Sequence, residues 1–119
     1  MANNKNKGLT RIVNAFGYSM QGFSAAYKHE EAFRQEILLA VVLIPLAFYL
    51  DVSTIERLLM VLSVLFVLVV EIINSAIEAV VDRFGGEHHE LSGRAKDMGS
   101  AAVWLALAML SFTWVMILL

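Results

Sequence analysis

The sequence predicts an all-α membrane protein, in which an amphipathic surface helix precedes three transmembrane helices. Hydrophobic residues make up 59% of the 119 residues, and the mean hydropathy is +0.69. Soluble domains contain only about 45–50% apolar residues. Three long apolar stretches alternate with short polar segments, which sets the number of spans, and the length allows one domain. Three spans make a thin bundle with a polar face open to lipid, so we also expect an oligomer.

Composition excludes several classes of protein. There is no cysteine, so disulfides and thiolate chemistry are absent. The net charge of −2 argues against a nucleic-acid partner. The first thirty residues lack the continuous apolar segment of a signal peptide, and none is expected.

The N-terminal part divides into a polar arm, residues 1–8, and an amphipathic helix, residues 9–28. At 100° per residue, seven apolar side chains of this helix fall within an arc of roughly 100°. They are Leu9, Ile12, Val13, Phe16, Met20, Phe23 and Tyr27. The pattern favours a helix lying in the membrane interface over a helix packed on protein.

The membrane domain, residues 29–119, begins with a span at about 30–50. Its uninterrupted apolar core, 37–50, is shorter than the ~20 residues that a bilayer requires. The span therefore includes the EEAFRQE segment on one side. A tight connection follows, in which Ser53 or Thr54 can cap the next helix.

The second span is expected at about 55–82 and the third at about 94–118. A polar loop, GGEHHELSG, separates them, and Ser92 can cap the third helix. Five lysines and arginines precede the first span, one lies in the first loop, three lie in or beside the second loop, and none follows the third span. This bias predicts that the N-terminus and residues 83–97 face the cytosol and that the C-terminus faces the opposite side of the membrane.

The cytosolic end of the second span carries an unusual polar face. Asn74, Glu78 and Asp82 all lie within about 60° of Glu71 in their direction around the helix. Charged groups at this depth are costly and usually face a protein interior or a hydrated cavity. This face is therefore the predicted functional site.

Other polar residues reach the same level of the membrane from the first and third spans. They are Glu30, Glu31, Arg34, Glu36, Lys96 and Asp97. Carboxylates without histidine or cysteine partners suit Mg²⁺, which often shares its ligands with substrate phosphates. Basic side chains suit phosphate oxygens, and a further carboxylate can accept a proton from a hydroxyl. These parts together indicate phosphoryl transfer from a magnesium nucleotide to the hydroxyl of a lipid.

Two segments, EIINSAIEAVVD and HHELSGRAKDMGSAAV, resemble the prokaryotic diacylglycerol kinase family, as does EEAFRQE. The resemblance covers roughly residues 9–119. It implies a homotrimer with a surface helix, three spans per subunit and active sites shared between subunits. It also implies ATP with Mg²⁺ as the phosphoryl donor, diacylglycerol as acceptor and phosphatidic acid as product.

The resemblance also implies roles for individual residues. Glu71 would be the catalytic base on the lipid hydroxyl, and Glu30 and Glu78 would hold the metal. The ATP-binding residues would be Arg11, Tyr18, Glu30, Asn74, Glu78, Glu87, His88, His89, Lys96 and Asp97. The lipid-binding residues would be Phe33, Arg34, Glu36, Glu71 and Ser100.

Several alternatives remain open at the level of sequence. Glu30 and Glu31 are adjacent, and only the resemblance selects Glu30. Glu36 lies about 240° around the helix from Glu30, so a lipid-facing or helix-pairing role suits it equally well. Asp82 suits a structural ion pair as well as a catalytic role. Lys96 could be only a positive anchor.

The alternatives extend to the histidines and to the function itself. His88 and His89 suggest zinc only weakly, because no cysteine accompanies them. The substrate could be undecaprenol, as in related kinases. A non-enzymatic reading is a small cation or proton conduit, but residues 58–70 and 101–119 offer only serine and threonine as polar groups.

Overall fold

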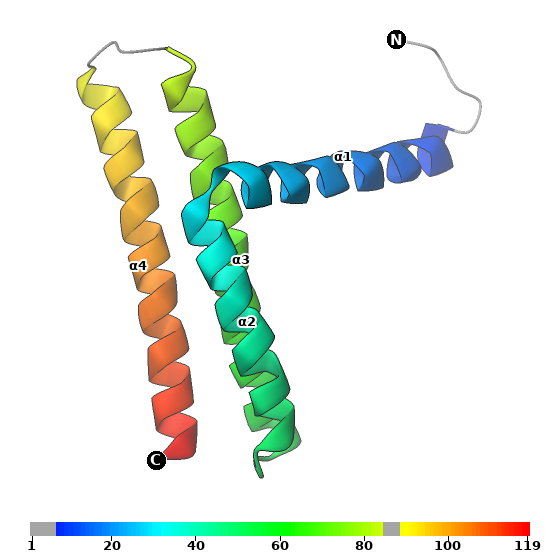
Figure 1. Ribbon diagram of the computed structural model, residues 1–119, viewed down its shortest axis with the longest axis vertical. Coiled ribbons are helices and arrows are strands. Elements are labelled where there is room, and N and C mark those ends of the chain that lie inside the picture. The colour runs from blue at the N-terminus through cyan, green and yellow to red at the C-terminus, as the bar shows by residue number, and fades with distance from the viewer. Residues whose placement is uncertain (1–6, 85–88) are drawn as a thin grey trace.

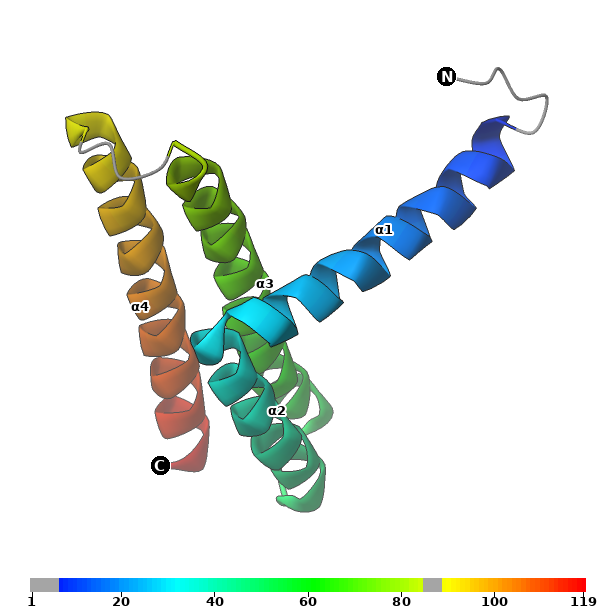
Figure 2. The same ribbon diagram turned by 45° about the horizontal axis from the view of Figure 1, so that its top comes forward.

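The computed structural model describes residues 7–84 and 89–119, which form four helices. Helix α1 (Lys7–His29) leads into α2 (Glu31–Tyr49), and α3 (Thr54–Asp82) and α4 (Glu90–Leu118) follow. Within these two described ranges there is no strand, so the predicted all-α class is confirmed. Helices α2, α3 and α4 run along the long axis of the molecule, and α1 leaves this bundle sideways (Figures 1 and 2).

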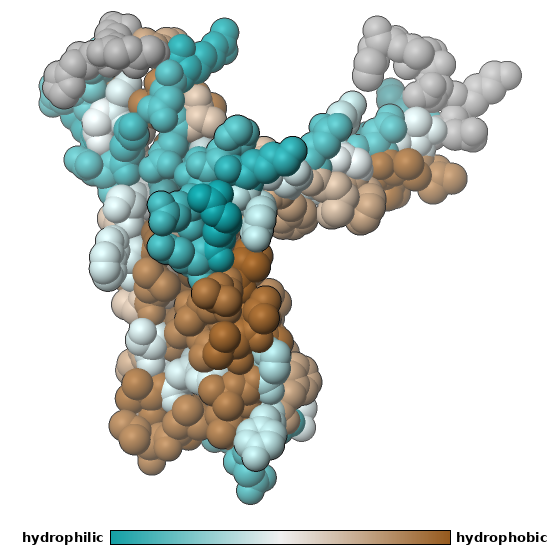
Figure 3. Space-filling model, in the orientation of Figure 1, coloured by the Kyte–Doolittle hydropathy of each residue, from teal (hydrophilic) through white to brown (hydrophobic). Residues whose placement is uncertain are grey.

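Three helices, α2, α3 and α4, are long and apolar enough to cross a membrane. Their surface forms an apolar band, drawn in brown below a polar upper region (Figure 3). Side chains in this band, such as Leu38, Leu65 and Phe112, are exposed. An apolar surface this extensive is typical of a chain that contacts lipid or other subunits.

Helix α1 is amphipathic, as the sequence predicts. Its apolar side chains, including Ile12 and Phe16, are exposed. Figure 3 shows apolar surface on the side of α1 that faces down along the bundle. The guanidinium of Arg34 on α2 fixes the end of α1, because its Nη1 donates to the carbonyl oxygens of Tyr27 at 2.7 Å and Lys28 at 3.2 Å. A basic group on the last carbonyls of a helix satisfies acceptors that have no partner within the helix.

The core lies where α3 packs against α2 and α4, and small residues allow the helices to approach. Ala47 on α2, Met60 and Val64 on α3, and Ala106 on α4 are almost completely buried. Trp114 joins this core, and its Nε1–H donates to the carbonyl oxygen of Met60 at 3.2 Å. Among the described residues, no Cα of α2 lies within 8 Å of a Cα of α4. Both helices therefore contact α3 while remaining apart from each other.

The connection between α2 and α3 contains two caps. Ser53 forms the predicted cap of α3: its Oγ accepts from the Glu56 N–H at 3.1 Å, and the Glu56 carboxylate accepts from the Ser53 N–H at 2.9 Å. This reciprocal pair is a capping box. Arg57 then donates to the carbonyl oxygens of Ala47 and Leu50 at the end of α2. These caps hold the two helices in a fixed antiparallel arrangement.

The start of α4 corrects one prediction. The sequence favours Ser92 as the N-cap and a loop as far as Gly93, but α4 begins at Glu90 with His89 as its N-cap. The Nδ1 of His89 accepts from the Leu91 N–H at 3.0 Å. This imidazole supplies the acceptor that the serine hydroxyl would have provided, so the helix gains about one extra turn.

Candidate functional site

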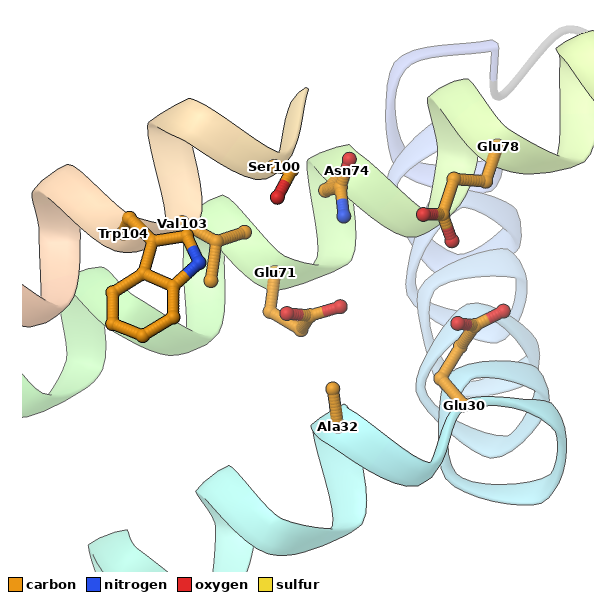
Figure 4. Close-up of a pocket in the computed structure, with 8 residues that line it drawn as sticks. All are labelled: Glu30, Ala32, Glu71, Asn74, Glu78, Ser100, Val103 and Trp104. Carbon is orange, nitrogen blue, oxygen red and sulfur yellow. The ribbon is translucent and has the colours of Figure 1, made fainter. Parts of the chain in front are cut away.

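A cavity of about 300 Å³ opens beside the buried end of the polar face on α3 (Figure 4). It lies at the level where α1 joins α2, because Glu30 of that junction lines it, and all three bundle helices contribute to it. Its lining residues are Glu30, Ala32, Glu71, Asn74, Glu78, Ser100, Val103 and Trp104. The cavity is open on one side, as expected from the separation between α2 and α4. Its volume is in the range of small-molecule sites.

Helix α3 supplies the polar wall of the cavity. Glu71, Asn74 and Glu78 follow each other at intervals of three and four residues, so their side chains share one face. Glu71 is only 3% exposed and Asn74 only 8%. The Glu71 carboxylate accepts a hydrogen bond from the Ser75 Oγ at 3.4 Å. The deepest acid of the predicted site is therefore buried, held by a neighbour, and still borders the cavity.

Glu30 enters the cavity from the junction between α1 and α2. It precedes α2 with an extended backbone, φ −116° and ψ 109°, and so breaks the helical path between the two elements. Its carboxylate points toward that of Glu78 across the cavity (Figure 4). The adjacent Glu31 is the first residue of α2, is exposed and does not line the cavity. The geometry thus favours Glu30 of the two.

Glu36 lies deeper on α2 and outside the cavity lining. It is 9% exposed, and its carboxyl group lies within hydrogen-bonding reach of the Glu71 carboxyl group. One of its oxygens, Oε1, has no hydrogen-bond partner among the described residues. The Glu36 carboxyl group therefore lies beside that of Glu71 and does not line the cavity.

Some of the other predicted lipid contacts line the cavity and some do not. Phe33 is buried at 3% exposure, and the Arg34 guanidinium binds the carbonyls at the end of α1. Ser100 and Glu71 do line the cavity. Only these two of the five predicted lipid-binding residues therefore border it.

Of the eight predicted nucleotide contacts that the structure describes, five do not line the cavity. Lys96 on α4 forms an ion pair with Asp82 on α3, with 3.0 Å between Nζ and Oδ1. Asp97 is exposed, and the His89 side chain caps α4. Glu87 and His88 fall outside the described residues.

Arg11 and Tyr18 lie on α1, far from the cavity of their own chain. Arg11 precedes the last residue of α1 by 18 positions, which is about 27 Å of helix. Figures 1 and 2 both show α1 leading away from the bundle. Both side chains are exposed. Neither residue lines the cavity of its own chain.

Asn74 depends on a glycine of α4 for its position. A Cβ atom added at Gly99 would overlap the Oδ1 of Asn74 and lie 3.1 Å from its Cγ. This Oδ1 has no hydrogen-bond partner in the described part of the chain. The missing side chain at Gly99 thus leaves the space that the Asn74 amide occupies beside the cavity.

Three lining residues were not among the predicted site residues: Ala32, Val103 and Trp104. Val103 and Trp104 follow Ser100 at i+3 and i+4, so they share its face of α4. Helical spacing from Ser100 could have identified them. Ala32 follows Glu30 by two residues, and its small side chain leaves the cavity open.

The arrangement separates two kinds of chemistry. Glu30 and Glu78 present two carboxylates at the outer end of the cavity, a donor set that suits a hard cation also held by phosphate oxygens. Within residues 7–84 and 89–119, no three histidine, aspartate or glutamate side chains lie close enough together to hold a metal ion. A cation bound by Glu30 and Glu78 would therefore need further oxygen ligands, such as those of a phosphate. Deeper in the cavity, the Glu71 carboxylate can accept a proton from a bound hydroxyl.

Comparison with known proteins adds independent information. A family model described as prokaryotic diacylglycerol kinase matches residues 17–118. The chain is 60% identical over 112 residues to a diacylglycerol kinase of Pseudomonas aeruginosa, covering 94% of this chain and 91% of that protein. It is 55% identical over 118 residues to a diacylglycerol kinase of Escherichia coli, covering 99% and 96%. It is 54% identical over 110 residues to one of Haemophilus influenzae, covering 92% and 93%.

Proposed function

Because the chain belongs to the prokaryotic diacylglycerol kinase family, we propose that it transfers the terminal phosphoryl group of ATP to the hydroxyl of diacylglycerol at the membrane surface. The product would be phosphatidic acid. The observation that carries this proposal is the buried Glu71 carboxylate, which borders a partly open cavity lined by residues of α2, α3 and α4. A membrane lipid can approach such an opening from the side.

Glu71 is proposed as the catalytic base. As the lipid oxygen bonds to the terminal phosphorus, the bond from that phosphorus to the bridging oxygen of ADP breaks, and the hydroxyl proton moves to Glu71. The hydrogen bond from Ser75 keeps one carboxylate oxygen in place, and Glu36 lies behind the same carboxylate. Orienting a base in this way is part of how positioned groups accelerate proton transfer.

Glu30 and Glu78 are proposed as ligands of Mg²⁺, which would neutralise charge on the nucleotide phosphates. Their facing carboxylates support this assignment (Figure 4). Asn74 borders the same space and would contact the phosphates. Lys96 is bonded to Asp82, and its ammonium group has further N–H donors with which it would bind a phosphate, so Asp82 would position the lysine.

A homotrimer with shared active sites is proposed from two features. Arg11 lies about 27 Å of helix from the end of α1, and neither Arg11 nor Tyr18 lines the cavity of its own chain. Many large apolar side chains of the spans are exposed. The number of subunits rests on the family resemblance alone. A bacterial inner-membrane location, with a cytosolic N-terminus and a periplasmic C-terminus, is proposed from the prokaryotic family to which the chain belongs. The lysine and arginine distribution supports the placement of residues 83–97 on the cytosolic side.

An assay with separate lipids tests the proposed function. The purified protein is given MgATP in detergent together with diacylglycerol, undecaprenol or a long-chain alcohol, one lipid at a time. We expect labelled phosphate to appear on diacylglycerol at the highest rate. A higher rate on undecaprenol would reassign the substrate, and transfer to none of the lipids would reject the kinase function.

The metal assignment predicts different behaviour for two adjacent glutamates. Glu30→Gln should raise the Mg²⁺ concentration needed for half-maximal activity by about tenfold or more, because a neutral amide oxygen is a weaker ligand for a hard cation. Glu78→Gln should do the same. Glu31→Gln is the matched control and should leave the Mg²⁺ titration unchanged, since Glu31 does not line the cavity. Equal shifts for Glu30→Gln and Glu31→Gln would contradict the assignment.

A further inference from the structure

Trp104 has a position that its membrane setting alone does not explain. It lines the cavity together with Ser100 and Val103, yet its side chain remains largely accessible, with the residue 71% exposed. Trp114, the other tryptophan of the chain, is 8% exposed and donates its Nε1–H to Met60 within the core. The two tryptophans therefore have different roles, although they share one helix.

The indole of Trp104 presents a polar edge to the cavity. In Figure 4 its nitrogen faces the side of the cavity where Glu71 lies, and the six-membered ring is directed away from it. The indole N–H is a donor only. No described residue accepts a hydrogen bond from it. A ligand that reaches Glu71 from the bilayer would meet this donor and would need an acceptor to match it.

The position of Trp104 along α4, and so its depth in the membrane, indicates which chemical groups that ligand would have. It follows Asp97, the last charged residue of α4, by seven positions, or about 10 Å along the helix. Beyond it the exposed side chains of α4 are mostly apolar, as at Leu105 and Phe112. Trp104 thus lies at the transition from the polar end of the cavity to the apolar surface. A diacylglycerol has the same order of groups: a hydroxyl, then ester carbonyls that only accept hydrogen bonds, then acyl chains.

We propose that Trp104 recognises the ester region of diacylglycerol, its Nε1–H donating to an ester carbonyl oxygen while the ring covers the first methylenes of an acyl chain. This inference rests on the proposed function and adds a specificity-determining residue to it. Glu71 would accept the hydroxyl proton, Ser100 would border the glycerol, and Trp104 would distinguish an ester from an ether. The aromatic ring also contributes apolar contact area, independently of the N–H.

Kinetics with two lipids separate the contribution of the N–H from that of the ring. Wild type, Trp104→Phe and Trp104→Ala are assayed with a diacylglycerol and with a dialkylglycerol of equal chain length, whose ether oxygens are poorer acceptors than ester carbonyls. Trp104→Phe should raise the KM for the diacylglycerol about three- to tenfold, as expected for one lost neutral hydrogen bond. It should leave the KM for the dialkylglycerol within twofold. Trp104→Ala should raise both KM values, and the KM for ATP should not change.

Phe112→Ala is the control for the loss of an exposed aromatic side chain, since Phe112 is 68% exposed on the same helix and does not line the cavity. Its ratio of ester to ether KM should equal that of wild type. The inference is overturned if Trp104→Phe leaves this ratio unchanged or if Phe112→Ala changes it equally.

A binding measurement without ATP separates this inference from the proposed function. In vesicles, diacylglycerol brominated near the ester should quench tryptophan fluorescence of the wild-type protein more than phosphatidylcholine brominated at the same position and present in the same proportion. Trp104→Phe should abolish this excess. Excess quenching without phosphoryl transfer would retain the lipid contact and reject the kinase function. Phosphoryl transfer without excess quenching would reject the contact.

Discussion

Replacing Glu71 with glutamine is expected to lower the turnover of diacylglycerol by about 10²–10⁴-fold, the usual contribution of a positioned base. Glutamine has nearly the same shape, and its amide oxygen can still accept the Ser75 hydrogen bond. It cannot accept the proton of the lipid hydroxyl. The secondary structure and the oligomer size should therefore remain those of wild type when measured by circular dichroism and by size-exclusion chromatography in detergent.

Glu56→Gln is the matched control for this substitution. Glu56 lies on the same helix, and glutamine preserves its capping role, because either residue completes a capping box. It should have nearly wild-type activity. If Glu71→Gln retained more than a tenth of wild-type turnover, Glu71 would not be the base. The same assay on Glu36→Gln/Glu71→Gln would then show whether the neighbouring Glu36 carboxyl had replaced it.

Gly99→Ala is expected to lower turnover by about 10²-fold without lowering the stability of the protein. The new methyl group would occupy the position of the Asn74 Oδ1, and the amide would have to rotate away from its place beside the cavity. A displacement of about 1 Å in an active site can cost this much activity. Alanine is itself a better helix former than glycine, by about 0.5–1 kcal/mol, so α4 should tolerate it. Turnover and thermal unfolding, measured on the same preparation, check both parts.

Two comparisons show whether Gly99 acts through Asn74. Gly93→Ala places the same methyl group on α4 where no atom lies within 4 Å, and it should be fully active. In an Asn74→Ala background the space beside Gly99 is empty, so Gly99→Ala should cause no further loss. Multiplicative losses in the double variant would mean that the glycine is needed for another reason.

Much of the fold could be predicted because it depends on local patterns. The spans follow from continuous apolar stretches, and the surface helix follows from the spacing of residues such as Ile12 and Phe16. The Ser53 cap follows from the serine and the glutamate three positions later. The start of α4 could not be predicted in this way, because His89 and Ser92 both offer an acceptor and the sequence does not rank an imidazole against a hydroxyl.

For the candidate site, the sequence could predict only which residues of one helix share a face. The shared face of Glu71, Asn74 and Glu78 depends on the helical repeat of α3, and all three border the cavity. The relation between Glu30 and Glu36 was not predictable, because an angle of about 240° assumes one continuous helix. The chain is extended at Glu30, so that angle does not apply.

The helical repeat of a sequence does not predict which residues of two different helices contact each other. The approach of Glu36 to Glu71 depends on how α2 is rotated against α3. Likewise, Trp104 and Trp114 are separated by about 80° around α4, so one borders the cavity and the other packs in the core. The spacing along α4 gives the angle between the two side chains but does not show which of them faces the cavity.

The separation between α2 and α4 has a consequence for how the enzyme encounters its lipid. A substrate that enters between these helices stays within the bilayer throughout, so its search is a two-dimensional diffusion. The encounter rate then depends on the number of diacylglycerol molecules per unit area of membrane. Adding inert phospholipid should slow the reaction at constant total diacylglycerol, whereas diluting the vesicle suspension with buffer should not.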